Sequence, residues 1–206
     1  MAFTAELPYI KGKVEIPQHL IKETLDGVPV FYKGYKDVLN KSKTSEEIMA
    51  DGLLQAIIKN WLHLLLSKAL DEEKYWILVG EIGSHLSHKN NLAYDLAVFE
   101  TSVLTPEKIA HKYADVPARL IIEIDAAVEY GQGKTNEEYI HRKTQRVLEF
   151  GTEKVIWIFT QTQKITVAEK GKDWVTFDWD RDVETLENVF FNLPAFLKKK
   201  KINLPE

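Results

Sequence analysis

The spacing of apolar residues predicts a long helix that begins near Thr44 and runs to about Leu70. Because Gly52 lies within this stretch, the sequence does not determine where the helix begins. The apolar arc is so wide that we expect a sheet to cover most of this helix. The apolar positions on its main face are Leu54, Ile57, Ile58, Trp61, Leu62, Leu65 and Ala69.

Segments rich in branched and aromatic residues follow, and they predict β-strands. The segment at 154–160 is apolar enough for burial on both faces. Lys170, Gly171 and Lys172 are typical of a hairpin turn between two later strands. A short helical turn is expected at 105–107. The predicted strands cover residues 75–82, 92–100, 119–125, 154–160, 164–169 and 174–179.

A second helix is predicted over residues 136–150, ending at Gly151, because glycine commonly caps helices. The order of elements is then helix, several strands, helix, strand and hairpin. This order predicts an α/β fold with a mixed central β-sheet flanked by helices, in which the second helix is a crossover between strands.

The chain is expected to form a single domain over residues 1–206. Prolines at 8, 17 and 29 suggest that residues 1–31 form an irregular arm packed on the body. Residues 32–169 form the predicted core, and residues 170–206 supply a strand, a helix or turn and a lysine-rich tail. For the apolar run at 186–197 we favour packing on the body over a homodimer contact, because the run is short.

Composition narrows the class of protein. The 206 residues, 45% of them hydrophobic, are enough to bury one core. There is no cysteine, which excludes disulfides and thiolate metal sites. A net charge of −4 gives no global attraction to polyanions, although a local basic patch can still bind phosphates. Neither a secretory signal nor a membrane-spanning stretch is visible, so we expect a cytoplasmic protein with no membrane partner.

Charged residues interrupt these apolar elements at four positions. Asp95, Glu123 and Asp125 lie inside predicted strands, and Glu123 and Asp125 share a face because strand side chains alternate. Strand pairing is expected to bring Asp95 beside Glu123. At about 100° per residue, Lys143 falls among the apolar residues of the second helix and points at the sheet.

Each position alone has an ordinary structural explanation. A carboxylate at a strand end caps a turn or faces solvent, and a lysine on an apolar face extends its ammonium group to water. One polar site, however, explains all four placements, because buried charges are costly unless they pair with each other or with a metal. Carboxylate oxygens suit Mg²⁺ or Mn²⁺.

At these residues the chain resembles the PD-(D/E)XK nuclease-like superfamily and, within it, the Uma-type restriction endonuclease family. The resemblance covers residues 32–169. It rests on Tyr94-Asp95, on the apolar strand around Glu123, on Lys143 in the next helix, and on Gly151 with the strand that follows. It implies a restriction-endonuclease-like core in which Asp95, Glu123 and the backbone carbonyl of Ile124 hold Mg²⁺ or Mn²⁺.

The chain departs from the superfamily pattern in two places. Tyr94 replaces the usual proline, which shapes the backbone and binds no metal. Asp125 occupies the position of the superfamily lysine, so the cationic role would fall to Lys143. Asp125 itself is a weaker candidate for the site, as an additional ligand or as a hydrogen-bond acceptor beside the ligands. The superfamily often has a further acidic residue near its first helix, which makes Glu47 a weak candidate, and Glu46 fits almost as well.

The resulting hypothesis is a divalent-metal-dependent endonuclease that hydrolyses DNA phosphodiester bonds. A catalytically inactive nuclease-fold protein that binds or assembles with others is the alternative, with the charged residues forming a structural ion-pair network. An antitoxin-like partner protein is a third option. The sequence leaves open which nucleic acid is cut and whether a homodimer forms.

Overall fold

The computed structural model describes residues 4–7, 10–126, 128–131 and 133–204. Its central strands are β3 (Ile21–Leu25), β4 (Val28–Tyr32), β5 (Tyr75–Ser87), β6 (Asn90–Glu100), β7 (Leu120–Ile124), β8 (Val128–Tyr130), β9 (Lys154–Phe159), β10 (Lys164–Glu169) and β11 (Val175–Asp178). In the described part of the chain these nine strands form one sheet in the order β11-β10-β9-β7-β6-β3-β4-β8, with β5 paired to β6. The β7–β9 pair is parallel, which makes the sheet mixed.

Helices and two small hairpin-like sheets complete the fold. The helices are α1 (Tyr35–Leu39), α2 (Ser45–Met49), α3 (Leu53–Ala69), α4 (Asn136–Phe150) and α5 (Leu193–Lys199), with 3-10 turns η1 (Gln18–Leu20) and η2 (Pro106–Lys108). The small sheets pair β1 (Thr4–Leu7) with β2 (Ile10–Glu15) and β12 (Val183–Glu184) with β13 (Phe190–Phe191). Among the described helices, none has the length and apolarity needed to cross a bilayer.

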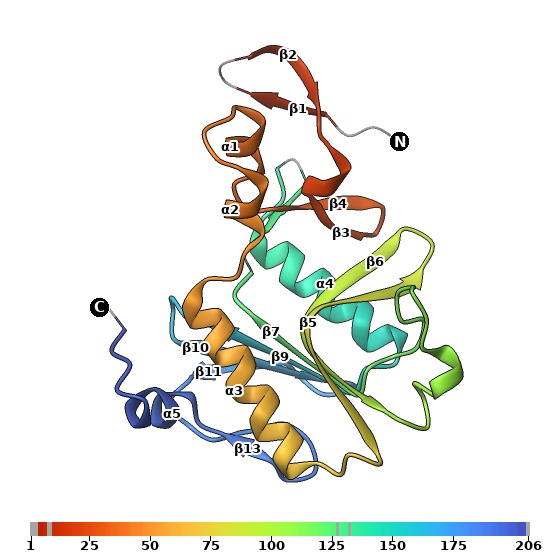
Figure 1. Cartoon of the computed structure of the whole chain (residues 1–206), viewed down its shortest axis with the longest axis vertical. Coiled ribbons are helices and arrows are strands. Elements are labelled where there is room, and N and C mark those ends of the chain that lie inside the picture. The colour runs from red at the N-terminus through yellow and green to blue at the C-terminus, as the bar shows by residue number, and fades with distance from the viewer. Residues whose placement is uncertain (1–3, 8–9, 127, 132, 205–206) are drawn as a thin grey trace.

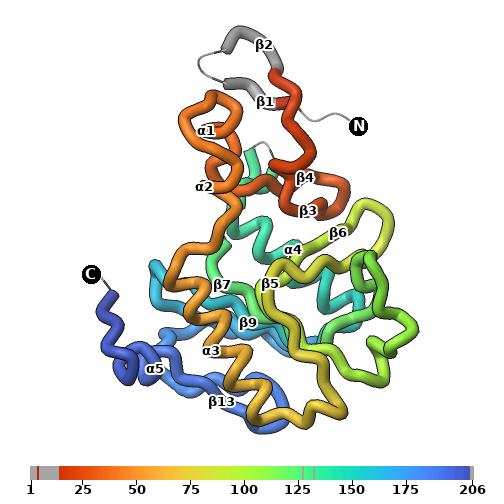
Figure 2. The backbone as a smooth tube through the Cα atoms, viewed as in Figure 1, coloured from red at the N-terminus to blue at the C-terminus, as the bar shows by residue number. Residues whose placement is uncertain are grey.

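The central sheet has a hydrophobic core on each face. One core joins α3 and α5 to side chains such as Leu96, Ile122 and Ile156, and the other joins α4 to side chains such as Ile121 and Trp157. Figures 1 and 2 show α3 in front of β7 and β9, and α4 behind β5 and β6. The middle strands β6, β7 and β9 are buried almost throughout. Polar groups on these strands are therefore shielded from water.

Much of this arrangement confirms the sequence prediction. The second helix covers residues 136–150 as predicted and is the crossover between the parallel strands β7 and β9. Gly151 caps it with a φ of 133°. The predicted turn at 105–107 is η2, and the predicted hairpin around Gly171 joins β10 to β11. The fold is an α/β fold with a mixed sheet flanked by helices.

Two predictions about the first 70 residues were wrong. The expected helix over 44–70 is broken at residues 50–52 into α2 and α3. Residues 1–31 are not an irregular arm, since β3 and β4 belong to the central sheet; residues 1–3 and 8–9 of that segment lie outside the described residues. The run at 186–197 packs on the body as expected, and Phe196 stacks on Trp61 with ring centroids 4.1 Å apart.

Candidate active site

The crossover helix α4 places Lys143 under the sheet. Its first turn is fixed by Thr135, whose side chain accepts a hydrogen bond from the backbone N–H of Glu138. Lys143 lies on the face that packs on the sheet and is 2% exposed. Its ammonium group lies within 6 Å of the ring centroids of Tyr94, Tyr139 and Trp157. A cation held this deeply needs anionic partners.

Two glutamates supply those partners. Lys143 Nζ lies 2.9 Å from Glu123 Oε1 on β7 and 3.1 Å from Glu23 Oε2 on β3. It also donates to the carbonyl of Ala93 at 2.7 Å and to the Tyr139 hydroxyl at 3.1 Å. Burial alone would lower the pKa of Lys143, but the two carboxylates hold it well above its usual value. The lysine therefore stays charged at any physiological pH.

For Glu123, burial has a larger effect on the pKa than the neighbouring charges. Its burial raises the pKa of its carboxyl group to about 7, with Asp95 and Glu23 adding to the rise and Lys143 opposing it. Oε1 is buried and lies 2.9 Å from Lys143 Nζ, and among the described residues no further donor forms a hydrogen bond to it. A carboxyl group of this kind exchanges its proton near neutral pH, which is the range that suits a general acid or base.

Glu23 is the member of this cluster that the sequence prediction missed. Its Oε2 accepts hydrogen bonds from Lys143 and from the backbone N–H of Ala93 at 2.9 Å. Its other oxygen, Oε1, is buried and has no hydrogen-bond partner among the described residues. The signal was present, because Asp26-Gly27 lies between two alternating apolar segments, which is typical of a two-residue hairpin.

Asp95 makes its contacts on the α3 side of the sheet. Its Oδ1 lies 2.8 Å from Lys59 Nζ, and Lys59 also bonds Asp51 Oδ2 at 2.7 Å. Lys59 is 4% exposed, and although burial would lower its pKa, Asp95 and Asp51 raise it. Sequence reasoning did not single out Lys59. The helical projection that identified Lys143 also puts Lys59 one turn from the buried Leu62.

The backbone of Ile124 links the two halves of the site. Its N–H donates to Asp95 Oδ2 at 2.8 Å, and its carbonyl accepts from Gln55 Nε2 at 2.9 Å. The β6–β7 register pairs Leu96 with Ile122, which puts Asp95 opposite Glu123. The predicted neighbourhood of Asp95 and Glu123 is therefore present, with one lysine on each side of the sheet.

The structure does not bring the two weaker candidates to this cluster. The strand ends at Ile124, and Asp125 has a φ of 55°, so the expected alternation with Glu123 is broken. Both Asp125 oxygens accept hydrogen bonds from Thr160, at 2.8 Å and 2.6 Å. Glu47 is exposed and accepts from the backbone N–H of Thr44 at 2.6 Å, where it completes the capping box of α2.

The predicted metal ligands fit a hard divalent cation in their chemistry. Asp95, Glu123 and the Ile124 carbonyl are adjoining oxygen donors of the kind that Mg²⁺ prefers. As folded here, the first two face lysine ammonium groups and the third a glutamine amide. No three His, Cys, Asp or Glu side chains of the described residues converge as a ready metal cage.

A pocket of about 700 Å³ lies beside the cluster on the N-terminal side. Glu23 lies in its lining together with Lys22, Thr24, Asn91 and Tyr113. Glu23 also contacts Lys143, and its side chain has no exposed surface, so the pocket lies next to the buried charges and does not open onto them.

Comparisons with known proteins support the fold. No family model matches the sequence, and no match was found among curated proteins. The structure is similar to the crystal structure of a "putative nuclease belonging to DUF820" from Anabaena variabilis ATCC 29413, with a TM-score of 0.59 and 15% sequence identity. The similarity covers 73% of this chain and 83% of that one. At this identity the likeness shows that the fold is nuclease-like.

Proposed function

We propose that the chain is an endonuclease that hydrolyses phosphodiester bonds of DNA, and that it is a distant relative of the Uma-type family. The observation that carries this proposal is the contact of Lys143 with Glu123, opposite Asp95, inside a nuclease-like fold. Buried acids and a buried lysine in one place are costly to stability, which favours a functional reason for keeping them.

In the proposed reaction the side chains have separate roles. Asp95, Glu123 and the carbonyl of Ile124 would hold Mg²⁺ or Mn²⁺, which when bound would polarise the phosphate and lower the pKa of a water. Lys143 would offset the negative charge that develops on the phosphate, because its ammonium group stays charged and nearly fixed among its partners. Glu23 would position Lys143 from the other side.

One observation favours a second candidate, a catalytically inactive nuclease-fold protein that binds or assembles with others. Lys59 already neutralises Asp95, and Lys143 already neutralises Glu123. A pair of buried ion-pair networks of this kind also fits a purely structural role. The two candidates differ in whether the acids bind a metal ion.

The test is cleavage of single-stranded and double-stranded DNA with Mg²⁺ or Mn²⁺, with a chelator as the metal control. Asp95→Ala and Lys143→Ala remove one predicted ligand and the predicted cation. Asp125→Ala is the matched control, because Asp125 is an acid from the same strand end that binds Thr160 instead of the cluster.

We expect metal-dependent cutting that both Asp95→Ala and Lys143→Ala reduce by roughly 10²-fold or more and that Asp125→Ala largely retains. Absence of cutting by the unaltered protein, together with calorimetry that finds no metal binding sensitive to Asp95→Ala, would leave the binding protein as the better account.

A further inference from the structure

The pocket beside Glu23 has the composition of a site for a neutral ring. Among its described lining residues, Lys22 is the cation, and its ammonium group lies 3.5 Å from Glu81. Glu15 adds an exposed carboxylate to the lining, whereas the side chain of Glu23 is fully buried and is paired with Lys143. A phosphate would therefore meet net negative charge, whereas an uncharged group with N–H donors would meet acceptor oxygens.

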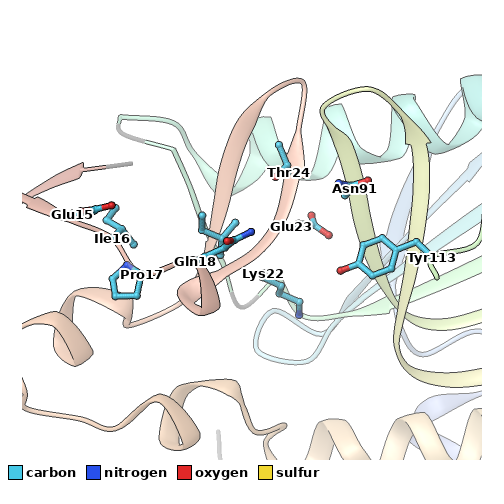
Figure 3. A pocket seen from close by; sticks show the side chains of 10 residues that line it. Glu15, Ile16, Pro17, Gln18, Lys22, Glu23, Thr24, Asn91 and Tyr113 are labelled. Carbon is cyan, nitrogen blue, oxygen red and sulfur yellow. The ribbon is translucent and has the colours of Figure 1, made fainter. Parts of the chain in front are cut away.

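An aromatic side chain stands at the opening of this pocket. Tyr113 is 53% exposed. Figure 3 shows its hydroxyl pointing across the opening toward the strand that carries Lys22, with Asn91 and the Glu23 carboxylate nearby. The exposed ring is thus available to a ligand at the level where the pocket admits solvent.

The strand beneath Tyr113 is shaped to receive its ring. A Cβ added at Gly83 on β5 would meet Tyr113 Cδ1 at 2.5 Å, Cε1 at 2.7 Å and Cγ at 2.9 Å. No side chain other than hydrogen fits between the strand and the ring at this separation. The segment of Tyr113 is also tied to this strand, because the N–H of His85 donates to the carbonyl of Ala114 at 2.8 Å and the N–H of Ala114 donates to the carbonyl of Gly83 at 3.0 Å.

From this geometry we propose that the pocket binds one unpaired nucleobase of a single-stranded or locally opened nucleic acid, stacked on Tyr113. Its volume of about 700 Å³ lies within the ~300–1,000 Å³ usual for small-molecule sites. Every base has a face that stacks on an aromatic ring, and the amino groups of bases are donors for the acceptor oxygens here.

The location of the pocket connects this inference to the proposed nuclease activity, on which it rests. Glu23 belongs to the pocket lining and also contacts Lys143. A base held on Tyr113 would bring its neighbouring phosphate toward the charged cluster. The protein would then act on unpaired or flipped nucleotides in preference to an intact duplex.

The test measures binding without cleavage, on the full chain in the presence of a chelator. The probe is a single-stranded oligonucleotide with one central 2-aminopurine, and a blunt duplex of the same sequence is its comparison. Anisotropy gives the Kd, and 2-aminopurine quenching reports stacking. The variants are Tyr113→Ala, Tyr113→Phe and Gly83→Ala, which displaces the ring without removing it.

We expect tighter binding of the single strand, with quenching retained in Tyr113→Phe. Tyr113→Ala and Gly83→Ala should weaken binding by roughly 5- to 150-fold and abolish the quenching. The control Phe190→Ala truncates an equally exposed aromatic residue, 50% exposed, on another sheet and should bind normally.

Unchanged binding by either Tyr113→Ala or Gly83→Ala, or an equal loss in Phe190→Ala, would overturn the inference. DNA cutting by a protein that fails this binding test would leave the nuclease proposal intact and remove the base pocket. Base binding by a protein that never cuts DNA would support the base pocket and contradict the nuclease proposal.

Discussion

Replacing Lys143 by methionine tests whether the buried ammonium group holds the cluster together. The change removes four polar contacts: those to Glu123 at 2.9 Å, to Glu23 at 3.1 Å, to the Ala93 carbonyl at 2.7 Å and to the Tyr139 hydroxyl at 3.1 Å. Methionine has a similar length and can pack among the surrounding rings, so little volume is lost. The main consequence is two buried carboxylates without a cation.

The expected cost is set by those carboxylates. Removing one partner of a buried ion pair typically costs ~3–5 kcal/mol, and we expect a loss in this range at pH 8. The freed carboxyl groups avoid part of the cost by taking up protons. The free energy of protonating a carboxylate falls by ~1.4 kcal/mol for each unit by which the pH is lowered. The loss of unfolding free energy in Lys143→Met, relative to the unaltered protein, should therefore shrink by at least ~1 kcal/mol at pH 5.5.

The assay is urea unfolding at both pH values, followed by tryptophan fluorescence. The matched control is Lys164→Met, which removes an exposed ion pair with Asp178; Lys164 is 46% exposed. Exposed pairs contribute ~0–1 kcal/mol, so the control should unfold nearly like the unaltered protein. A loss below 1 kcal/mol for Lys143→Met at pH 8, equal to the control, would refute the reasoning.

Three further predictions follow from the same contacts. The unfolding free energy of the metal-free protein, measured relative to Glu123→Gln, should fall by up to ~3 kcal/mol as the pH rises from 4.5 to about 7. The reason is that the Glu123 carboxyl group keeps its proton up to a pKa of about 7 in the folded protein, whereas in the unfolded chain it loses the proton near its ordinary pKa. A difference in unfolding free energy that stays constant across this pH window would contradict the prediction. Lys59→Met should bind Mn²⁺ at least ~10-fold more tightly in calorimetry, because the cation 2.8 Å from Asp95 is gone, and weaker binding would contradict the proposed ligand. Gly151→Ala should cost more than ~1 kcal/mol in urea unfolding, since φ is 133° and a Cβ would lie 3.0 Å from Pro117; equal stability would contradict this.

The parts of the site that the sequence predicted are those where burial and charge conflict within one element. Lys143 lies among apolar residues of a helix, and Glu123 interrupts a strand that is buried throughout. Both conflicts are visible without tertiary information, because the helix and strand periods assign each side chain to a face. The neighbourhood of Asp95 and Glu123 followed from the strand order alone.

The parts that were missed depend on tertiary pairing or on a local change of backbone. Glu23 reaches the cluster because β3 joins the sheet beside β6, an adjacency between residues far apart in sequence. Asp125 leaves the face of Glu123 because its φ of 55° ends the strand one residue earlier than the apolar run suggests. The long helix was broken by a segment that leaves Asp51 free to bond Lys59.

The central claim is that the buried acids and lysine are catalytic machinery. The measurement that tests it most directly is DNA cleavage by Glu123→Gln with Mg²⁺, made on samples whose folding is checked by circular dichroism. Glutamine keeps the size of the side chain and removes its charge and its proton exchange. The account predicts a folded variant that cuts at least ~10²-fold more slowly than the unaltered protein. Equal rates in the two folded proteins would contradict it.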